Sequence, residues 1–274
     1  NLIILNPNEL DETGLVCLTG RRARHVVEVL HGRKGQVLRV GLLDGPRGAG
    51  TIEEAGRERV AVRCRFDAWV APVPRVDVLL ALPRPKVMKR LWAPLASMGV
   101  GSIWLTNAEK VERDYFDTHW LDPAHYEPLL IEGLEQAGDT RLPKVTVIKR
   151  LKPFLEDELS AAFPGPSRLV AHPGEGKSVA TLRLKAGDRV LVALGPEGGW
   201  TEFELKMLDR VGFKRVSMGA RTLRIDTACV AILALLNGLA DKPGFRLPLG
   251  ARAGVRGVSN AEERSNKGGP RWKR

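Results

Sequence analysis

The stretch LGPEGGWTEFELKML, residues 194–208, places three glycines, a proline and a glutamate directly before an amphipathic helical pattern. It follows RVLVAL, a continuous apolar run that is typical of a strand buried on both faces. Thr201 and Glu204 have the spacing of a capping box, so a helix is expected over residues 201–211. The loop then lies at the carboxyl end of a strand, where open α/β sheets bind ligands.

The glycines of this loop indicate a close approach between backbone and ligand. Gly198 and Gly199 permit backbone conformations that other residues avoid, and their main-chain groups can meet a flat ring such as an adenine, or a methionyl group. The alternative is an ordinary strand-to-helix turn, which needs one glycine rather than three. The spacing fits neither a phosphate-binding loop nor a dinucleotide fingerprint, which argues against a kinase, a GTPase or a dehydrogenase.

A second unit of the same design follows about twenty residues later. The strand pattern KRVSM leads into GARTLRID and then into the apolar helix TACVAILALLNGL, with Asp226 or Thr227 as its N-cap. Two loops of this kind, each between a buried strand and a helix, could close on one ligand from two sides.

The part of the chain from residue 75 to 240 alternates strand and helix patterns. Apolar runs include VDVLLAL, SIWLT and SRLVAH, and helices are expected over residues 86–97, 123–137, 201–211 and 227–239. This rhythm predicts an α/β fold with a parallel sheet. We therefore expect the domain that carries the chemistry at residues 75–240.

Residues 1–74 read instead as a small mixed β domain. The short β-like runs are NLIIL, LVCL, QVLRVGLL, GTIEEA and RVAVRCRF, with one helix that begins after Thr19 as N-cap and leaves Arg21, Arg22 and Arg24 outside. The glycine cluster GPRGAG, residues 45–50, is predicted to be a hairpin connection. Pro72 and Pro74 mark a linker to the second domain.

Basic residues dominate the end of the chain. The formal net charge is +11, and residues 241–274 hold nine Lys and Arg against three Asp and Glu. Few apolar residues accompany them, so we predict a mostly disordered basic tail. It is either an electrostatic tether to nucleic acid or a solubilising end.

Cysteine and histidine spacing predicts no metal site and no disulfide. Cys17, Cys64 and Cys229 lie far apart, the five histidines show no ligand spacing, and Cys229 is expected to be a buried thiol rather than a nucleophile. The longest apolar run, residues 228–236, is too short to span a membrane, and the first residues lack a signal-peptide pattern. A cytoplasmic location is the expectation, although a start at Asn1 leaves open a removed targeting segment.

Two motifs together resemble a known family. LGPEGGWTEFEL followed by MGARTLRIDTACVAILALL resembles the paired carboxy-terminal signatures of the RsmE family, the 16S ribosomal RNA uridine-N3 methyltransferases of the SPOUT superfamily. HVVEVLHGRKGQVLRV resembles that family's amino-terminal RNA-binding β-barrel, a PUA-like domain. The resemblance implies a trefoil-knotted α/β domain, bound S-adenosylmethionine, a homodimer with the site near its interface, and ribosomal RNA or the small ribosomal subunit as partner.

The resemblance also assigns residues by position. The implied cofactor-binding residues are Ala171, His172, Leu194, Gly195, Pro196, Glu197, Gly198, Gly199, Met218, Gly219 and Leu223. Glu135 and Gln136 match a Glu-Gln segment that faces the site in the family, although their residue types alone suggest a solvated helix end. RNA contacts are expected at these two residues and at Arg21, Arg22 and Arg24.

Uridine methylation at N3 would place specific demands on the second loop. Methyl transfer needs the acceptor nitrogen held in line with the methyl, and loss of the N3 proton puts negative charge on N3, O2 and O4. Arg224 is the first candidate to stabilise that charge and Arg221 the second, while Asp226 could orient the arginine, accept the proton or cap the helix. Because N3 lies on the pairing edge, the target base must be unpaired or flipped.

Several positions depart from the family pattern. Asp139 stands where arginine is usual, Asp226 where glutamate is usual, and APLASMGV brings Pro94 and Ser97 into a segment that is normally Lys-x-x-Glu-Leu-Gly-Val. These changes affect the choice of uridine or RNA more than cofactor binding. A knotted ribose 2′-O-methyltransferase and a non-catalytic RNA-binding ribosome-assembly factor are the alternatives.

Overall fold

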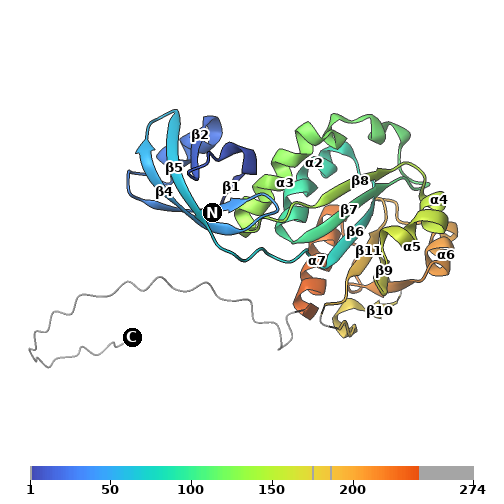
Figure 1. Cartoon of the computed structure of the whole chain (residues 1–274). Coiled ribbons are helices and arrows are strands. Elements are labelled where there is room, and N and C mark those ends of the chain that lie inside the picture. Colours follow the sequence, from blue (N-terminus) through green and yellow to red (C-terminus); the bar gives the residue numbers. More distant parts are fainter. Residues whose placement is uncertain (1, 175, 186, 241–274) are drawn as a thin grey trace, which may run out of the picture.

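The computed structural model describes residues 2–240, apart from residues 175 and 186. Two sheets make up this part of the chain, and they lie side by side with a helix between them (Figure 1). The basic tail predicted at residues 241–274 lies outside the described residues.

The first sheet has five strands in the order β1-β3-β4-β5-β2. Its strands are β1 (Ile3–Leu5), β2 (Leu15–Thr19), β3 (Val37–Leu42), β4 (Arg47–Ala55) and β5 (Arg59–Phe66). The β1-β3 pair is parallel and the other pairs are antiparallel. The helix α1 (Gly20–Arg24) continues as the π-helical turn η2 (His25–Val29), and Val26 closes the core of this sheet.

Two predictions for this region are wrong in part. The cluster at residues 45–50 is not only a connection, because β4 begins at Arg47 and the turn is confined to residues 43–46. The glycines serve close strand packing: a Cβ on Gly48 would come within 2.0 Å of the Arg65 carbonyl oxygen, and one on Gly50 within 2.5 Å of Val62. Arg22 is also not free in solvent, since its guanidinium pairs with Glu9.

The second sheet confirms the predicted parallel α/β architecture. Its seven strands lie in the order β10-β12-β9-β11-β6-β7-β8, and all of the pairs are parallel. The strands are β6 (Val76–Ala81), β7 (Val100–Thr106), β8 (Lys144–Ile148), β9 (Ser167–Ala171), β10 (Lys177–Ser178), β11 (Val190–Leu194) and β12 (Phe213–Ser217). The strand β8 was not predicted, because its half-exposed edge position leaves only a weak apolar pattern.

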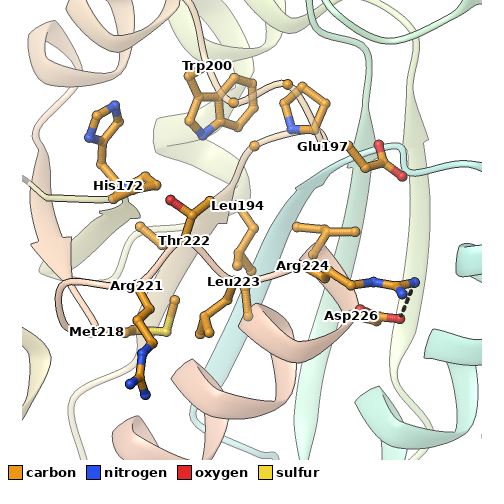
Figure 2. Close-up of a pocket in the computed structure, with 18 of the residues that line it drawn as sticks. His172, Leu194, Glu197, Trp200, Met218, Arg221, Thr222, Leu223, Arg224 and Asp226 are labelled. Carbon is orange, nitrogen blue, oxygen red and sulfur yellow. Dashed lines mark hydrogen bonds and ion pairs between the residues drawn. The ribbon is translucent and has the colours of Figure 1, made fainter.

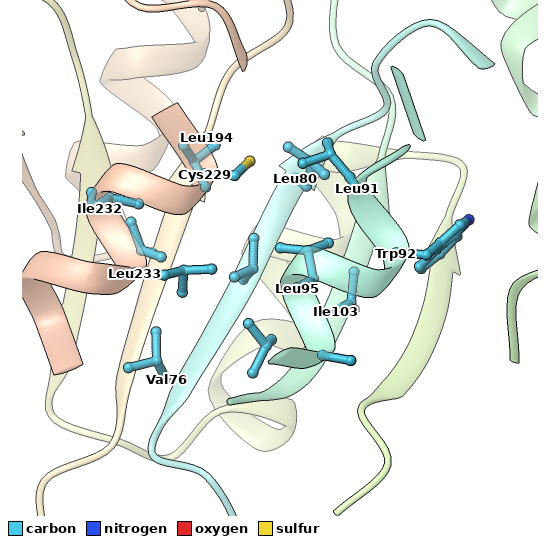
Figure 3. Packing of buried hydrophobic residues seen from close by; sticks show 14 of the residues in the cluster. Val76, Leu80, Leu91, Trp92, Leu95, Ile103, Leu194, Cys229, Ile232 and Leu233 are labelled. Carbon is cyan, nitrogen blue, oxygen red and sulfur yellow. The ribbon is translucent and has the colours of Figure 1, made fainter. Parts of the chain in front are cut away.

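Helices cover both faces of this sheet. The first face carries α2 (Pro85–Ser97), α3 (Pro123–Ala137) and α7 (Ile225–Ala240), and the second carries α4 (Leu151–Pro153), η5 (Phe154–Glu158), α5 (Leu159–Ala162) and α6 (Glu202–Arg210). Successive residues of β6 enter opposite cores, as alternation along a strand requires: Leu80 packs with the first group and Leu79 with the second. Figure 3 shows the first core, where α2 and α7 meet over β6.

The first sheet rests on the carboxyl end of α3. The Leu2 N–H donates to the Glu135 carbonyl oxygen at 3.1 Å, and the Arg47 guanidinium donates to the Gly138 carbonyl oxygen at 3.1 Å. Residues 67–75 connect the sheets without regular secondary structure. Among the described residues, no helix is long and apolar enough to cross a membrane.

Candidate functional site

A pocket of about 650 Å³ opens at the carboxyl ends of β9, β11, β12 and β6. Its size is typical of sites that enclose a small molecule. All of the residues assigned to the cofactor from the sequence line it, together with both catalytic candidates: Ala171, His172, Leu194, Gly195, Pro196, Glu197, Gly198, Gly199, Met218, Gly219, Leu223, Arg224 and Asp226. The structure therefore brings the two glycine-containing loops together (Figure 2).

Sequence reasoning missed other residues of this pocket. Arg84 and Val87 reach it from the start of α2, and Trp200, Thr222, Ile225 and Ala228 complete the wall. Arg84 and Val87 could have been found only from the strand order, which places β6 next to β11. Trp200 could have been found from its place at the end of the glycine loop.

The first loop is fixed by the predicted capping box. The Glu204 carboxylate accepts from the Thr201 N–H at 2.8 Å, and the Glu204 N–H donates to the Thr201 hydroxyl at 3.4 Å. The buried Glu204 also accepts from the Glu109 N–H at 2.8 Å, so it ties the loop after β7 to this helix start. The Lys110 ammonium donates to the Gly198 carbonyl oxygen at 2.8 Å, which holds the glycine turn from outside.

The glycines of the pocket have different reasons to be glycine. Gly199 and Gly219 have φ of 71° and 122°, a region that L side chains avoid, and a Cβ on either would meet no atom within 4 Å. Gly198 is different: its φ is not positive, and its Cβ would meet the Lys110 side chain at 2.8 Å. Of the two glycines expected to adopt conformations that other residues avoid, Gly199 does so and Gly198 does not.

Two polar atoms in the pocket wall have no hydrogen-bond partner among the described residues. They are the indole N–H of Trp200, a residue that is only 6% exposed, and Nδ1 of His172. Unpaired buried polar groups are uncommon and costly in a folded protein. In Figure 2 both rings lie away from the Arg224–Asp226 pair, beside the apolar wall of Leu194. Each of these nitrogen atoms exposes less than 1 Å² in this structure, so the two rings offer a ligand flat apolar surface rather than these polar atoms.

Charged groups occupy the opposite end of the pocket. The Asp226 carboxylate lies 3.1 Å from the Arg90 guanidinium and 3.4 Å from the Arg224 guanidinium, and it accepts from the Thr227 N–H at 3.0 Å. Desolvation alone would raise the pKa of Asp226, but the Thr227 N–H and the charges of Arg224 and Arg90 outweigh it and lower that pKa. The carboxylate is thereby held ionised and is a weak base. Arg221 also lines the pocket but points away from this group (Figure 2).

The start of α7 differs from the prediction. The helix begins at Ile225, so Asp226 lies in its first turn, and neither Asp226 nor Thr227 precedes the helix as an N-cap. The Ala228 N–H donates to the Arg224 carbonyl oxygen at 2.7 Å, which closes that first turn. Ionised Asp226 is well placed there, because helix amino termini favour negative charge.

The residues predicted to bind RNA do not line the pocket. The Arg21 side chain is 68% exposed on the first sheet and lies 3.8 Å from the Glu135 carboxylate. Desolvation raises the pKa of Glu135, and this effect outweighs the opposite effect of the neighbouring charges and hydrogen bond. Arg24 and Gln136 are exposed, whereas Arg22 is held by Glu9. Glu135 and its neighbour thus lie where α3 meets the first sheet.

The buried thiol beside the pocket is inert. Burial raises the pKa of the Cys229 thiol to about 12, as expected for a structural cysteine. Within the described part of the chain, no three His, Cys, Asp or Glu side chains form a group that could hold a metal ion.

Residues 71–237 match the model of a family described as RNA methyltransferase domain. The chain belongs to this family. It is 29% identical to the ribosomal RNA small subunit methyltransferase E of Treponema pallidum, over 86% of this chain and 90% of that one. It is 27% identical to the ribosomal RNA small subunit methyltransferase E 1 of Borreliella burgdorferi, over 84% and 94% of the two chains. The resemblance to RsmE is confirmed.

Solved structures show the same fold for this RNA methyltransferase domain protein. The ribosomal RNA small subunit methyltransferase E of Neisseria gonorrhoeae, bound to S-adenosyl methionine, superposes with a TM-score of 0.67 at 22% identity, over 87% of this chain and 97% of that one. A methyltransferase from Legionella pneumophila, in complex with the cofactor SAM, gives a TM-score of 0.68 at 23% identity, over 86% and 96%.

Proposed function

We propose that this chain is an S-adenosylmethionine-dependent methyltransferase that methylates N3 of a uridine in small-subunit (16S) ribosomal RNA. The observation that carries the proposal is the pocket formed by two strand-loop-helix units within the segment matched by the RNA methyltransferase family. The names of the relatives from Treponema pallidum and Borreliella burgdorferi support the choice of RNA.

The pocket wall suits the proposed cofactor. Leu194, Met218 and Leu223 supply apolar surface, and the rings of Trp200 and His172 add flat surface on which an adenine could pack. When bound, S-adenosylmethionine supplies an activated methyl group on a sulfonium. The protein contributes position: the backbone at the two loops would hold that group against an acceptor.

Arg224 is the group that we assign to charge stabilisation. It is 74% exposed at the mouth of the pocket, where a flipped base could reach its guanidinium. Negative charge develops on a uridine as its N3 proton leaves. The attraction between a fixed cation and the base is strongest in that state. Asp226 orients Arg224, and its lowered pKa makes water a better proton acceptor than this carboxylate.

The finer architecture is also part of the proposal. A trefoil knot is supported by α7, which packs against α2 and also against η6 (Val179–Thr181) in the connection from β9 to β11. A homodimer is supported by an exposed apolar stripe on α7, where Val230 and Leu235 are 40% and 37% exposed. The curled first sheet would be the PUA-like RNA-binding domain, with Arg21 and Arg24 toward RNA, and the site of action would be cytoplasmic.

Two measurements test the function. Calorimetry with purified protein should give S-adenosylmethionine binding, and ribosomal RNA from a strain without the gene should lack 3-methyluridine that the intact gene restores. Mass analysis of digested nucleosides separates this outcome from a ribose 2′-O-methyl product. Tight RNA binding without any cofactor binding would identify a non-catalytic assembly factor instead.

A further inference from the structure

A band of basic and aromatic side chains runs from the mouth of the pocket across α2. Arg84, Lys86, Lys89 and Arg90 follow one another through the first turns of this helix, and all four are exposed. The band ends on η4 (His119–Leu121) and the start of α3, where His119, Trp120 and His125 lie together. We refer to these seven residues as the α2 band.

Specific contacts anchor both ends of the α2 band. At the pocket end, Arg84 lines the cavity and the Arg90 guanidinium lies 3.1 Å from Asp226. At the far end, the Lys89 ammonium lies 4.4 Å from the centre of the Trp120 ring. Because Lys89 and Arg90 are adjacent in the chain, the band is continuous from the catalytic candidates to the aromatic cluster.

Most cations of the α2 band have no ion-pair partner among the described residues, although the Glu197 carboxylate accepts from the Arg84 N–H at 3.2 Å at the pocket end. Within the described part of the chain, Arg84, Lys86 and Lys89 belong to no ion pair, and Arg90 shares Asp226 with Arg224. At the other end of the band, Asp122 lies 3.9 Å from His125. A surface with an excess of cations favours a polyanion.

The aromatic end of the band is rigidly held. The Trp92 indole N–H donates to the Trp120 carbonyl oxygen at 3.2 Å, and Trp92 stacks on Tyr126 with ring centroids 4.8 Å apart. The His119 ring lies 4.3 Å from the Trp120 ring and is itself exposed. Surfaces that combine cations with aromatic rings bind single-stranded nucleic acid, since phosphates pair with the cations and bases stack on the rings.

We infer that the α2 band binds the single-stranded RNA next to the target nucleotide and leads it into the pocket. This inference rests on the proposed function and adds a path for the substrate outside the cofactor site and outside the first sheet. A base that stacks on Trp120 would move the Lys89 ammonium from the ring toward the backbone phosphate. The partner is a flexible single strand rather than a duplex, because the rings can stack only on unpaired bases.

The test measures binding of fluorescein-labelled decauridine to the full-length chain over a range of salt concentrations. The double variant Lys86→Gln, Lys89→Gln should lower the slope of log affinity against log salt by about 1.4, which is about 0.7 for each phosphate that the protein no longer neutralises. Trp120→Leu should weaken binding about 5- to 100-fold with no change of slope, and Trp120→Phe should restore most of it.

Matched controls lie on the opposite helical layer. The double variant Lys152→Gln, Lys206→Gln removes the same charge from α4 and α6, and Phe203→Leu removes an aromatic ring that is 59% exposed on α6. These variants should change neither the slope nor the affinity. Equal losses in the control and band variants would show a nonspecific charge effect and overturn the inference.

The remaining outcomes separate this inference from the proposed function. All of the variants should bind S-adenosylmethionine as the wild type does, which also shows that they are folded. If the wild type binds decauridine and the band variants bind equally well, only the α2 band is overturned. If the wild type binds neither decauridine nor cofactor, both proposals fall. A band variant with normal RNA affinity but an altered molar mass in light scattering would assign the band to a subunit contact instead.

Discussion

The Arg224 guanidinium lies 3.4 Å from the Asp226 carboxylate, and the same carboxylate oxygen lies 3.1 Å from the guanidinium of Arg90. One acidic group thus positions two cations from different elements at the mouth of the pocket. The side chains of Arg224, Asp226 and Arg90 remain 74%, 26% and 55% exposed, so a substrate can reach them in place of water.

The first prediction concerns turnover after the loss of Arg224. If its charge is needed mainly as N3 loses its proton, Arg224→Ala should lower kcat about 100- to 1000-fold. The affinities for cofactor and RNA should change little, and the remaining rate should rise with pH because deprotonation of the base becomes limiting. Single-turnover assays with saturating RNA measure this effect. A loss below about tenfold would contradict the assignment.

The second prediction concerns the proton acceptor. Because the lowered pKa of Asp226 makes it a weak base, Asp226→Asn should keep activity within about tenfold of the wild type. A carboxylate with a lowered pKa stabilises the fold above its ordinary pKa, and that stabilisation is lost as the pH falls through the folded value. Asp226→Asn should therefore remove part of the stability that the wild type loses as the pH falls below the ordinary pKa of an aspartate, as thermal unfolding in acid would show. A much larger loss of activity would restore Asp226 as the proton acceptor.

The pocket was largely predictable because its signals are local. A capping box such as Thr201 and Glu204 and an apolar strand such as β11 are read from neighbouring residues. The parallel sheet then places the loops at one edge, without knowledge of any long-range contact.

What sequence reasoning missed depends on tertiary position. Arg84 reaches the pocket only because β6 pairs with β11, and Arg22 is drawn out of solvent only because Glu9 lies beside it. The strand β8 and the helical segment at residues 151–162 have short, mixed patterns that packing stabilises more than local preference does. The start of α7 was placed two residues late, since Ile225 and Asp226 give no decisive boundary signal.

A third prediction compares two glycines of the pocket. Gly219→Ala forces a side chain into a backbone conformation with φ of 122°, which costs about 1–3 kcal/mol or displaces the loop. We expect S-adenosylmethionine affinity to fall at least about tenfold. Gly198→Ala is the matched control, because its methyl would meet only the flexible Lys110 side chain and should cost less than about threefold. Calorimetry measures the affinity of both variants. Equal losses would mean that a side chain at Gly198 disturbs the pocket as much as one at Gly219.

A fourth prediction uses the unpaired indole N–H of Trp200. Trp200→Phe keeps an aromatic ring in the wall and removes a buried donor that has no partner among the described residues. Because an unsatisfied buried group costs about 1–3 kcal/mol, the free protein should be equally or more stable. Because the N–H exposes less than 1 Å² in this structure, calorimetry should give a cofactor affinity within about threefold of the wild type. A loss of about tenfold or more would mean that the N–H turns toward the ligand on binding.

The last prediction concerns the ion pair that β6 makes below the pocket. Asp77 is fully buried on β6 and lies 2.5 Å from the Arg189 guanidinium. Removing one partner of a buried ion pair leaves an uncompensated charge. Arg189→Ala should therefore lower the free energy of unfolding by about 3 kcal/mol at neutral pH. This value is modest because the Arg189 side chain is 43% exposed.

The pH dependence of this loss follows from the same carboxyl group. Desolvation raises the pKa of Asp77 more than the charge of Arg189 lowers it, and without Arg189 the carboxyl would protonate at still higher pH. A raised folded-state pKa contributes stability that is present below the unfolded pKa and lost as the pH rises through the folded value. The penalty of Arg189→Ala should therefore be larger at about pH 8 than at about pH 5, and Asp77→Asn in the same chain should reduce it. Urea unfolding of the single and double variants at both pH values measures the difference. A penalty that does not vary with pH would show that Arg189 acts through packing on Phe163. The centre of the Phe163 ring lies 6.0 Å from the Arg189 guanidinium.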